Sequence, residues 1–258
     1  MEPAIARDRL SAALLDDDCL NALWALVDSG EAEQIIPELP ALALEQDPIH
    51  KHKDVLAHTI AVTAKTRADL VLRLAALFHD IGKPRTRKID ENGVTFRHHE
   101  AVGAKMAKKR LRELEYPVDV VRDVTELVRL SGRFKGYADG WSDSAVRRYA
   151  RDAGHLLGLL NELVRSDCTT RNQRKRLELH HHVDAIEERI LELAAADRRK
   201  AERPLIDGQA VMDRFEVGPG PMVGKALKFL LALKRAEPDL DLAGTEERLD
   251  AWWNEQLD

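Results

Sequence analysis

The chain has 258 residues, of which 44% are hydrophobic, 33% are charged and 5% are aromatic, and its formal net charge is −5. This composition excludes wholesale disorder and residence in a membrane, and the scarcity of aromatic residues disfavours a β sandwich. The two cysteines, Cys19 and Cys168, can build neither a disulfide framework nor a cysteine-based zinc site. We therefore expect a cytoplasmic protein that would bind nucleic acid only through local basic patches.

Apolar residues recur at helical spacing along most of the chain. Asp16–Asp18 interrupts the first such stretch, and a turn at Glu91–Gly93 precedes a short extended stretch at Val94–Phe96. The spacing predicts an all-α protein with helices over residues 5–30, 51–66, 69–81, 99–115, 118–130, 142–152, 154–167, 171–200 and 222–236.

A histidine and an aspartate, His79 and Asp80, end the most apolar of these predicted helices. Buried ionisable groups are costly unless they are paired or bound to a metal. Imidazole and carboxylate are ligands that suit Zn, Mn, Fe, Co or Ni. The pair therefore indicates a metal site, although a helix-end histidine beside a capping carboxylate would give the same local pattern.

Two further ligands are available from other predicted helices. His58 lies on the helix that precedes His79, and Asp167 ends a later apolar helix, so the four side chains would form a mixed site with open positions for water and substrate. Asp54 shares a helical face with His58 and would orient its ring by a hydrogen bond; an exposed carboxylate is the equally weighted alternative.

The order of His58, His79-Asp80 and Asp167 resembles the HD superfamily of metal-dependent phosphohydrolases. The form His-Asp-x-Gly-Lys at residues 79–83 is a specific hallmark of that superfamily. The resemblance implies one divalent ion, which would be Mn, Ni, Co, Fe, Zn or Mg. The implied ligands are His58, His79, Asp80 and Asp167.

The resemblance also implies roles for residues near these ligands. Asp80 would act in catalysis, Lys83 would neutralise a phosphate, and His99 would contact the phosphate or a second metal. Many HD enzymes carry a histidine near Ser131, and the serine here favours a single metal or a weak second site. For Lys83 and His99, a helix-end lysine and a polar helix start remain the alternatives.

Four segments narrow the resemblance to the C-terminal half of bacterial CCA-adding tRNA nucleotidyltransferases that carry an HD domain. These segments are residues 47–58, 98–104, 165–172 and 218–224. The resemblance implies a neck- or body-like helical segment at 1–47, an HD domain at 48–170 and a C-terminal helical arm at 171–258 that contacts RNA.

The nucleotidyltransferase head of that family, which needs paired carboxylates, has no counterpart here. We interpret the Asp-x-Asp at 239–241 as part of a solvated loop and not as such a catalytic pair. We therefore expect hydrolysis of nucleotide or RNA phosphoesters of the 2′,3′-cyclic phosphate or 2′-phosphate type, linked to tRNA 3′ ends, and no CCA addition by this chain alone. The alternative is a non-catalytic tRNA-binding subunit, the body and tail of a split tRNA nucleotidyltransferase, whose head would be a separate partner. A third possibility is that the chain is a truncated form of such an enzyme. A homodimer is the alternative to a separate head as partner.

Basic residues flank the predicted ligands and the turn at 217–224. Such runs are usually solvated faces, but their placement suits an RNA backbone or a phosphate. His180–His182 resembles a metal motif, but consecutive helical residues cannot all face one ion, so a solvated polar helix is favoured. The predicted phosphate- and RNA-binding residues are Arg85, Arg87, Arg171, Arg174, Lys175 and Lys225.

Overall fold

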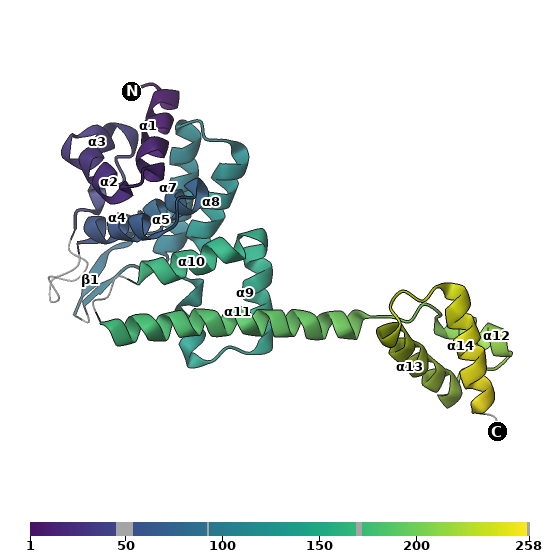
Figure 1. Cartoon of the computed structure of the whole chain (residues 1–258). Coiled ribbons are helices and arrows are strands. Elements are labelled where there is room, and N and C mark those ends of the chain that lie inside the picture. Colours follow the sequence, from purple (N-terminus) through teal and green to yellow (C-terminus); the bar gives the residue numbers. More distant parts are fainter. Residues whose placement is uncertain (45–53, 92, 169–171, 257–258) are drawn as a thin grey trace. The chain divides into compact units, whose positions relative to one another are not determined.

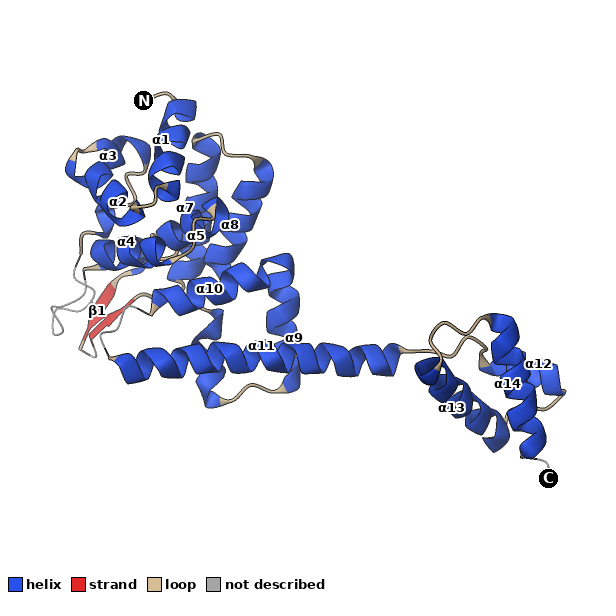
Figure 2. Cartoon of the chain, in the orientation of Figure 1, coloured by secondary structure: helices blue, strands red, loops and turns tan. Residues whose placement is uncertain are grey.

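The computed structural model describes residues 1–44, 54–91, 93–168 and 172–256, and these form two compact units, Met1–Leu191 and Glu192–Asp258. The described chain is helical apart from one small hairpin, which confirms the all-α prediction (Figures 1 and 2). The boundary between the units falls inside one long helix. The finer division into segments 1–47, 48–170 and 171–258 stays a prediction.

The elements of the first unit follow the chain in the order α1 (Pro3–Leu15), α2 (Cys19–Asp28), α3 (Glu31–Ile35), η1 (Pro40–Leu42), α4 (Val55–Lys65), α5 (Leu70–Phe78), α6 (Lys83–Thr86), β1 (Lys88–Asp90), β2 (Gly93–Thr95), α7 (His99–Glu113), α8 (Val118–Leu130), η2 (Arg133–Asp139), α9 (Asp143–Ala153), η3 (Gly154–Leu156) and α10 (Leu157–Asp167). α11 (Gln173–Ala201) crosses into the second unit, which continues with α12 (Gly208–Phe215), α13 (Pro221–Ala236) and α14 (Leu242–Glu255).

Aspartates set the start of several helices, because a side-chain oxygen accepts a hydrogen bond from a free backbone N–H of the first turn. Asp18 caps α2 in this way, which confirms the break predicted at Asp16–Asp18. Asp69 caps α5 and thereby fixes the first turn of the helix that leads to His79. These caps position the helices that carry the site.

The α5 helix forms the centre of the first unit. Every residue from Leu72 to Phe78 is buried, and α5 packs against α4, α8 and α10 (Figure 1). A helix that is apolar on all sides is stable only when other elements surround it. α5 ends at Phe78, short of the predicted residue 81, and Pro84 lies in the first turn of α6.

The hairpin follows α6. β1 and β2 pair antiparallel, with Lys88 opposite Thr95 and Ile89 opposite Val94. β2 overlaps the predicted extended stretch at Val94 and Thr95.

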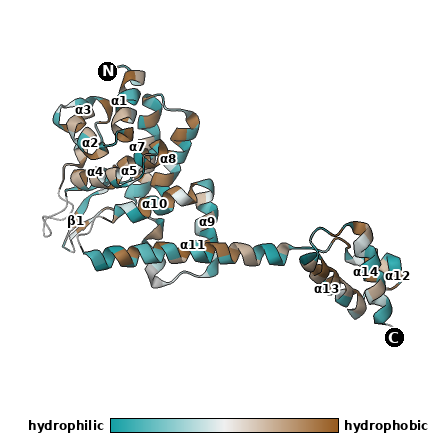
Figure 3. Cartoon of the chain, viewed as in Figure 1, coloured by the Kyte–Doolittle hydropathy of each residue, from teal (hydrophilic) through white to brown (hydrophobic). Residues whose placement is uncertain are grey.

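The α11 helix is polar over most of its length, and hydrophilic residues along it are interrupted by a few hydrophobic ones (Figure 3). Its buried residues are Val183 and Ile186, which lie in the part that belongs to the first unit. Arg165 of α10 holds that part through ion pairs with Asp184 and Glu187, each at 2.7 Å.

The second unit has a hydrophobic core of its own, built from α12, α13 and α14. The core includes Val211, Leu230, Leu249 and Trp253, and the ring of Phe215 stacks on that of Trp253 at 4.0 Å between centroids. Among the described residues of the whole chain, no helix combines the length and the apolarity that crossing a bilayer requires.

Candidate metal centre

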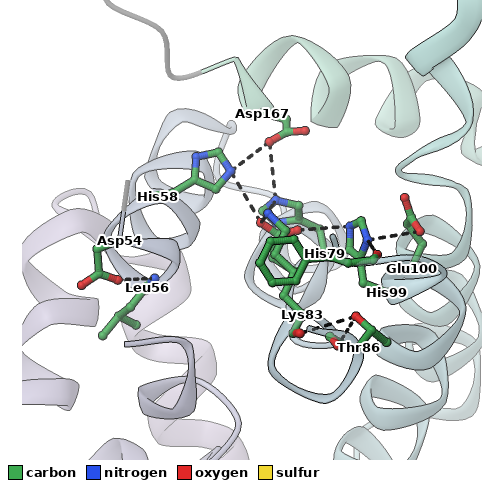
Figure 4. A network of polar contacts seen from close by, with 12 residues as sticks. Asp54, Leu56, His58, His79, Lys83, Thr86, His99, Glu100 and Asp167 are labelled. Carbon is green, nitrogen blue, oxygen red and sulfur yellow. Dashed lines mark hydrogen bonds and ion pairs between the residues drawn. The ribbon is translucent and has the colours of Figure 1, made fainter. Parts of the chain in front are cut away.

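Three helices bring the predicted ligands together. His58 lies on α4, His79 caps the C-terminus of α5 with Asp80 directly after it, and Asp167 is the last residue of α10. Because α5 packs against both α4 and α10, residues that are far apart in the sequence meet at the end of α5 (Figure 4).

The ligand atoms lie close enough to share one ion. The Nε2 atom of His58 is 3.0 Å from Oδ1 of Asp167 and 3.7 Å from Oδ2 of Asp80. The Nε2 atom of His79 is 3.2 Å from Oδ2 of Asp80 and 3.5 Å from Oδ1 of Asp167. The ligand atoms of His58, His79 and Asp167 all lie within 4.8 Å of one another.

The His79 ring is arranged as a metal ligand. Its Nδ1–H donates to the carbonyl oxygen of Ala76 at 2.7 Å, which directs the other nitrogen, Nε2, at the two carboxylates. That Nε2 atom is buried and has no hydrogen-bond partner in the described structure. Such buried polar atoms call for an explanation, and a hydrogen bond from Nδ1–H to a carbonyl is the usual support for a metal-bound histidine. The residues present therefore fit a divalent ion.

The charges of the site are strongly coupled. Burial lowers the pKa of the His79 imidazole, but the carboxylates of Asp80 and Asp167 outweigh it and raise the pKa to about 10. Burial raises the pKa of Asp80, yet His79, His99 and Lys83 hold it well below its usual range. Two ionised carboxylates thus attract a positive charge to one point, where a divalent ion would replace the proton on His79.

Lys83 and His99 contact the Asp80 carboxylate from the other side. The Lys83 ammonium donates to Oδ2 of Asp80 at 2.6 Å, and the side chain of Lys83 is 9% exposed. The Nε2 atom of His99 is 3.5 Å from Oδ1 of Asp80, while its Nδ1–H donates to the carbonyl of Phe96 at 2.8 Å. The two side chains therefore hold the orientation of Asp80, and their predicted roles toward phosphate stay predictions.

A glycine permits this arrangement. A Cβ atom on Gly82 would lie 2.1 Å from the carbonyl oxygen of His99 and 2.8 Å from the backbone nitrogen of Gly103. Only glycine allows the chain after Asp80 to approach the start of α7 so closely. The glycine in the motif thus explains how His99 reaches Asp80.

Asp54 caps α4. Its carboxylate accepts hydrogen bonds from the backbone N–H groups of Leu56, at 2.7 Å, and Ala57, at 3.4 Å, and points at the first turn of the helix (Figure 4). Asp54 thereby fixes the start of the helix that carries His58. Its predicted hydrogen bond to the His58 ring stays a prediction.

A pocket of about 230 Å³ adjoins Asp167. Leu179 and His182 of α11 line it together with Ser131, Phe134 and residues near the end of α10. A solvated polar helix is predicted at His180–His182, yet His182 is half-buried here and its ring lies 6.3 Å from that of Tyr137. Sequence reasoning missed this wall of the site because the polar pattern of α11 does not show what the helix covers.

The predicted basic residues occupy different positions. Arg85 of α6 is exposed, and Arg87 is half-buried with its Nε atom buried and without a partner in the described structure. Arg174 and Lys175 are exposed in the first turn of α11, and Lys225 is exposed on α13. Arg171 lies outside the described residues.

The fold and the site define an HD domain. Residues 55–216 match the HD domain family, and the chain belongs to that family. It is 32% identical over 233 residues to the A-adding tRNA nucleotidyltransferase of Deinococcus radiodurans, which covers 87% of this chain and 52% of that protein. It is also 32% identical over 237 residues to the CC-adding tRNA nucleotidyltransferase of Thermus thermophilus, covering 87% of this chain and 51% of the relative.

A shorter similarity extends to the multifunctional CCA protein of Pseudomonas paraeruginosa, with 30% identity over 145 residues, 54% of this chain and 33% of that protein. The chain thus spans about half the length of the first two relatives and a third of this one. The resemblance to the HD-containing part of tRNA nucleotidyltransferases is confirmed.

Proposed function

We propose that the protein is a metal-dependent phosphohydrolase that acts on nucleotide or RNA phosphoesters linked to tRNA 3′ ends. The observation that carries the proposal is the buried Nε2 atom of His79, which has no hydrogen-bond partner in the described structure and faces the carboxylates of Asp80 and Asp167. Membership of the HD domain family supports the same chemistry.

His58, His79, Asp80 and Asp167 would hold the ion, which lowers the pKa of a bound water and polarises a phosphate oxygen. Within the chain, Ala76 fixes the His79 ring through its carbonyl, and Lys83 and His99 fix the Asp80 carboxylate. Asp167 is the ligand that lines the pocket of about 230 Å³, so a small phosphoester would approach the ion from the Asp167 side.

The proposed substrates are 2′,3′-cyclic phosphates and 2′-phosphates of nucleotides or of RNA ends. The relatives are named as tRNA nucleotidyltransferases and CCA proteins, which supports a substrate connected with the tRNA 3′ end. A cytoplasmic location is part of the same proposal.

The wild-type protein is expected to hydrolyse 2′,3′-cyclic AMP when Ni²⁺, Mn²⁺ or Co²⁺ is added, and to stop when the metal is chelated. Because the ion binds the folded protein, a concentration about 100 times its Kd should stabilise that protein by roughly 2.7 kcal/mol. Product release by chromatography and the thermal midpoint with and without metal measure the two effects. A folded sample that shows neither turnover nor a metal-dependent shift with any of these ions would refute the proposal.

A second candidate function is tRNA binding without hydrolysis, as the body and tail of a split nucleotidyltransferase. The exposed Arg174 and Lys175 on the first turn of α11 favour it, as do the relatives. A separate nucleotidyltransferase head would then be the partner, and a homodimer is the alternative assembly.

Replacing Arg174, Lys175 and Lys225 together by alanine is expected to weaken tRNA binding to a similar extent for different tRNA sequences. Each lost phosphate contact should reduce the slope of log affinity against log salt by about 0.9 on a duplex. Filter binding over a range of salt concentrations measures both.

Lys228→Ala provides a matched control for Lys225, because Lys228 is an equally exposed lysine farther along α13. We expect Lys228→Ala to leave tRNA affinity close to that of the wild type. Equal losses in the two lysine variants would show that net charge, and not a specific phosphate contact, determines the affinity.

A further inference from the structure

Aromatic rings gather on η2, on α9 and on the loop between them, next to the pocket that adjoins Asp167. Phe134, Tyr137, Trp141 and Tyr149 form an aromatic cluster in a chain that is only 5% aromatic. Phe134 stacks on Tyr137 with centroids 5.3 Å apart, and Trp141 lies edge-on to Tyr137 and to Tyr149, at 5.3 Å from each. The catalytic proposal makes no use of these rings.

The aromatic cluster connects two pockets. Phe134 lines the pocket of about 230 Å³ beside Asp167, and its ring centroid is 6.3 Å from that of Trp141. Trp141 and Tyr149 line a second pocket of about 350 Å³, together with Arg133 and Arg148. The rings therefore link the pocket beside Asp167 to the second pocket, and a ligand that occupied both would pass the cluster.

The members of the cluster differ in burial. Phe134 is 6% exposed and Tyr149 is 3% exposed, and the Tyr149 hydroxyl donates to the amide oxygen of Asn161 at 2.7 Å, so these two serve the fold. Tyr137 and Trp141 are only half-buried and present part of their rings at the surface. These partly exposed rings are available for stacking with a ligand.

The second pocket also carries positive charge. None of the described residues that line it is a carboxylate, and Arg133 pairs with Asp152, which lies outside the lining. Arg148 is exposed and has no ion-pair partner within the described residues. A partly exposed indole beside a free guanidinium favours a ligand that is both flat and anionic.

We propose that the aromatic cluster and Arg148 bind the single-stranded end of an RNA whose terminal nucleotide enters the pocket beside Asp167. The next base would stack on Trp141, and Arg148 would contact the backbone phosphate. Stacking on aromatic side chains combined with a cationic groove is how proteins bind single strands without sequence preference. The proposal rests on the proposed function, since it specifies the substrate as a single-stranded end.

The size of the first pocket favours a single strand over a duplex. Its volume of about 230 Å³ is below that of pockets that hold drug-sized ligands, so it admits one base or one sugar phosphate. In a duplex, the bases stack on each other and their faces are not free for Trp141. We therefore expect single-stranded RNA to bind more tightly than the same sequence in a duplex.

The test measures binding of the full chain to a fluorescently labelled RNA hexanucleotide by anisotropy, in the absence of turnover. Trp141→Ala is expected to weaken binding roughly tenfold, and Trp141→Phe to retain most of the affinity. Arg148→Ala is expected to weaken binding about threefold and to reduce the salt slope by about 0.7. If Trp141→Ala fails to fold, as its helical spectrum would show, Trp141→Phe and Arg148→Ala still decide the question.

Arg112→Ala is the matched control. Arg112 is also exposed and without an ion-pair partner in the described structure, but it lines a different pocket between α7, α8 and η3. Equal losses in Arg112→Ala and Arg148→Ala, unchanged binding in Trp141→Ala, or equally tight binding of duplex RNA would each overturn the proposal. Lack of hydrolysis of 2′,3′-cyclic AMP would refute the proposed function. It would not change the outcome of this RNA-binding test, which is measured without turnover.

Discussion

Replacing Asp167 by asparagine is expected to abolish metal-dependent hydrolysis and the metal-dependent rise in thermal midpoint. The Asp167 side chain is 42% exposed, so its loss should cost only about 1 kcal/mol of stability in the metal-free protein. The change removes a charged ligand from a site that has few protein ligands, and the remaining groups hold an ion weakly. Turnover of 2′,3′-cyclic AMP and melting curves with and without metal measure the two effects.

Asp80→Asn tests a carboxylate that has two roles, since Asp80 is a proposed metal ligand and also the ion-pair partner of Lys83. The side chain of Asp80 is 3% exposed and pairs with the buried Lys83, so the variant leaves an ammonium without its partner and should lose about 3–5 kcal/mol. The double variant Asp80→Asn/Lys83→Met should recover stability but not metal binding. If Asp167→Asn keeps its metal-dependent shift, Asp167 is not a ligand and the proposed centre is wrong.

Gly82→Ala is expected to destabilise the first unit by on the order of 3 kcal/mol and to disrupt the contact of His99 with Asp80. The added Cβ would meet the backbone of His99 and Gly103, which cannot rotate away as a flexible side chain would. α7 would therefore have to shift as a whole. Chemical denaturation measures the stability, and metal-dependent turnover measures the effect on the site.

Gly158→Ala is the control for this prediction. Gly158 lies inside α10, where an added Cβ would meet no atom within 4 Å, so alanine should stabilise the helix by about 0.5–1 kcal/mol. A Gly82→Ala protein as stable and active as Gly158→Ala would mean that α7 does not approach Gly82 as closely as the structure has it.

Much of the centre could be predicted because its signal is local. His79 and Asp80 stand out as ionisable residues at the end of an apolar helix, and Asp167 ends another apolar helix. Their convergence follows from the burial of α5 between α4 and α10. The spacing of apolar residues likewise predicted the all-α fold, since it repeats over helices long enough to show the period.

Features that depend on distant packing could not be predicted. The buried Arg73 donates to carbonyl oxygens of Leu14, Asp16 and Thr66, which no sequence pattern indicates. The apolar spacing predicts no helix at 208–215 or 242–255, where α12 and α14 lie. The Asp-x-Asp that we interpret as a solvated loop includes Asp241, which caps α14 by accepting from the N–H of Gly244. In these segments the polar residues obscure the period, and the core of the second unit forms only when the three helices pack together.

The stacked rings of Phe215 and Trp253 give the second unit an optical signal of its own. These parallel rings contribute the melting of α12 to α14 to the near-ultraviolet circular dichroism, beside the contribution of the aromatic cluster in the first unit, whereas thermal shifts caused by metal report the unit that carries the ligands. A single sample can thus yield two melting curves, one for each unit. A variant that destabilises the metal centre should lower the thermal midpoint of the first unit, while the signal of the stacked Phe215 and Trp253 rings should be lost at the same temperature as in the wild type.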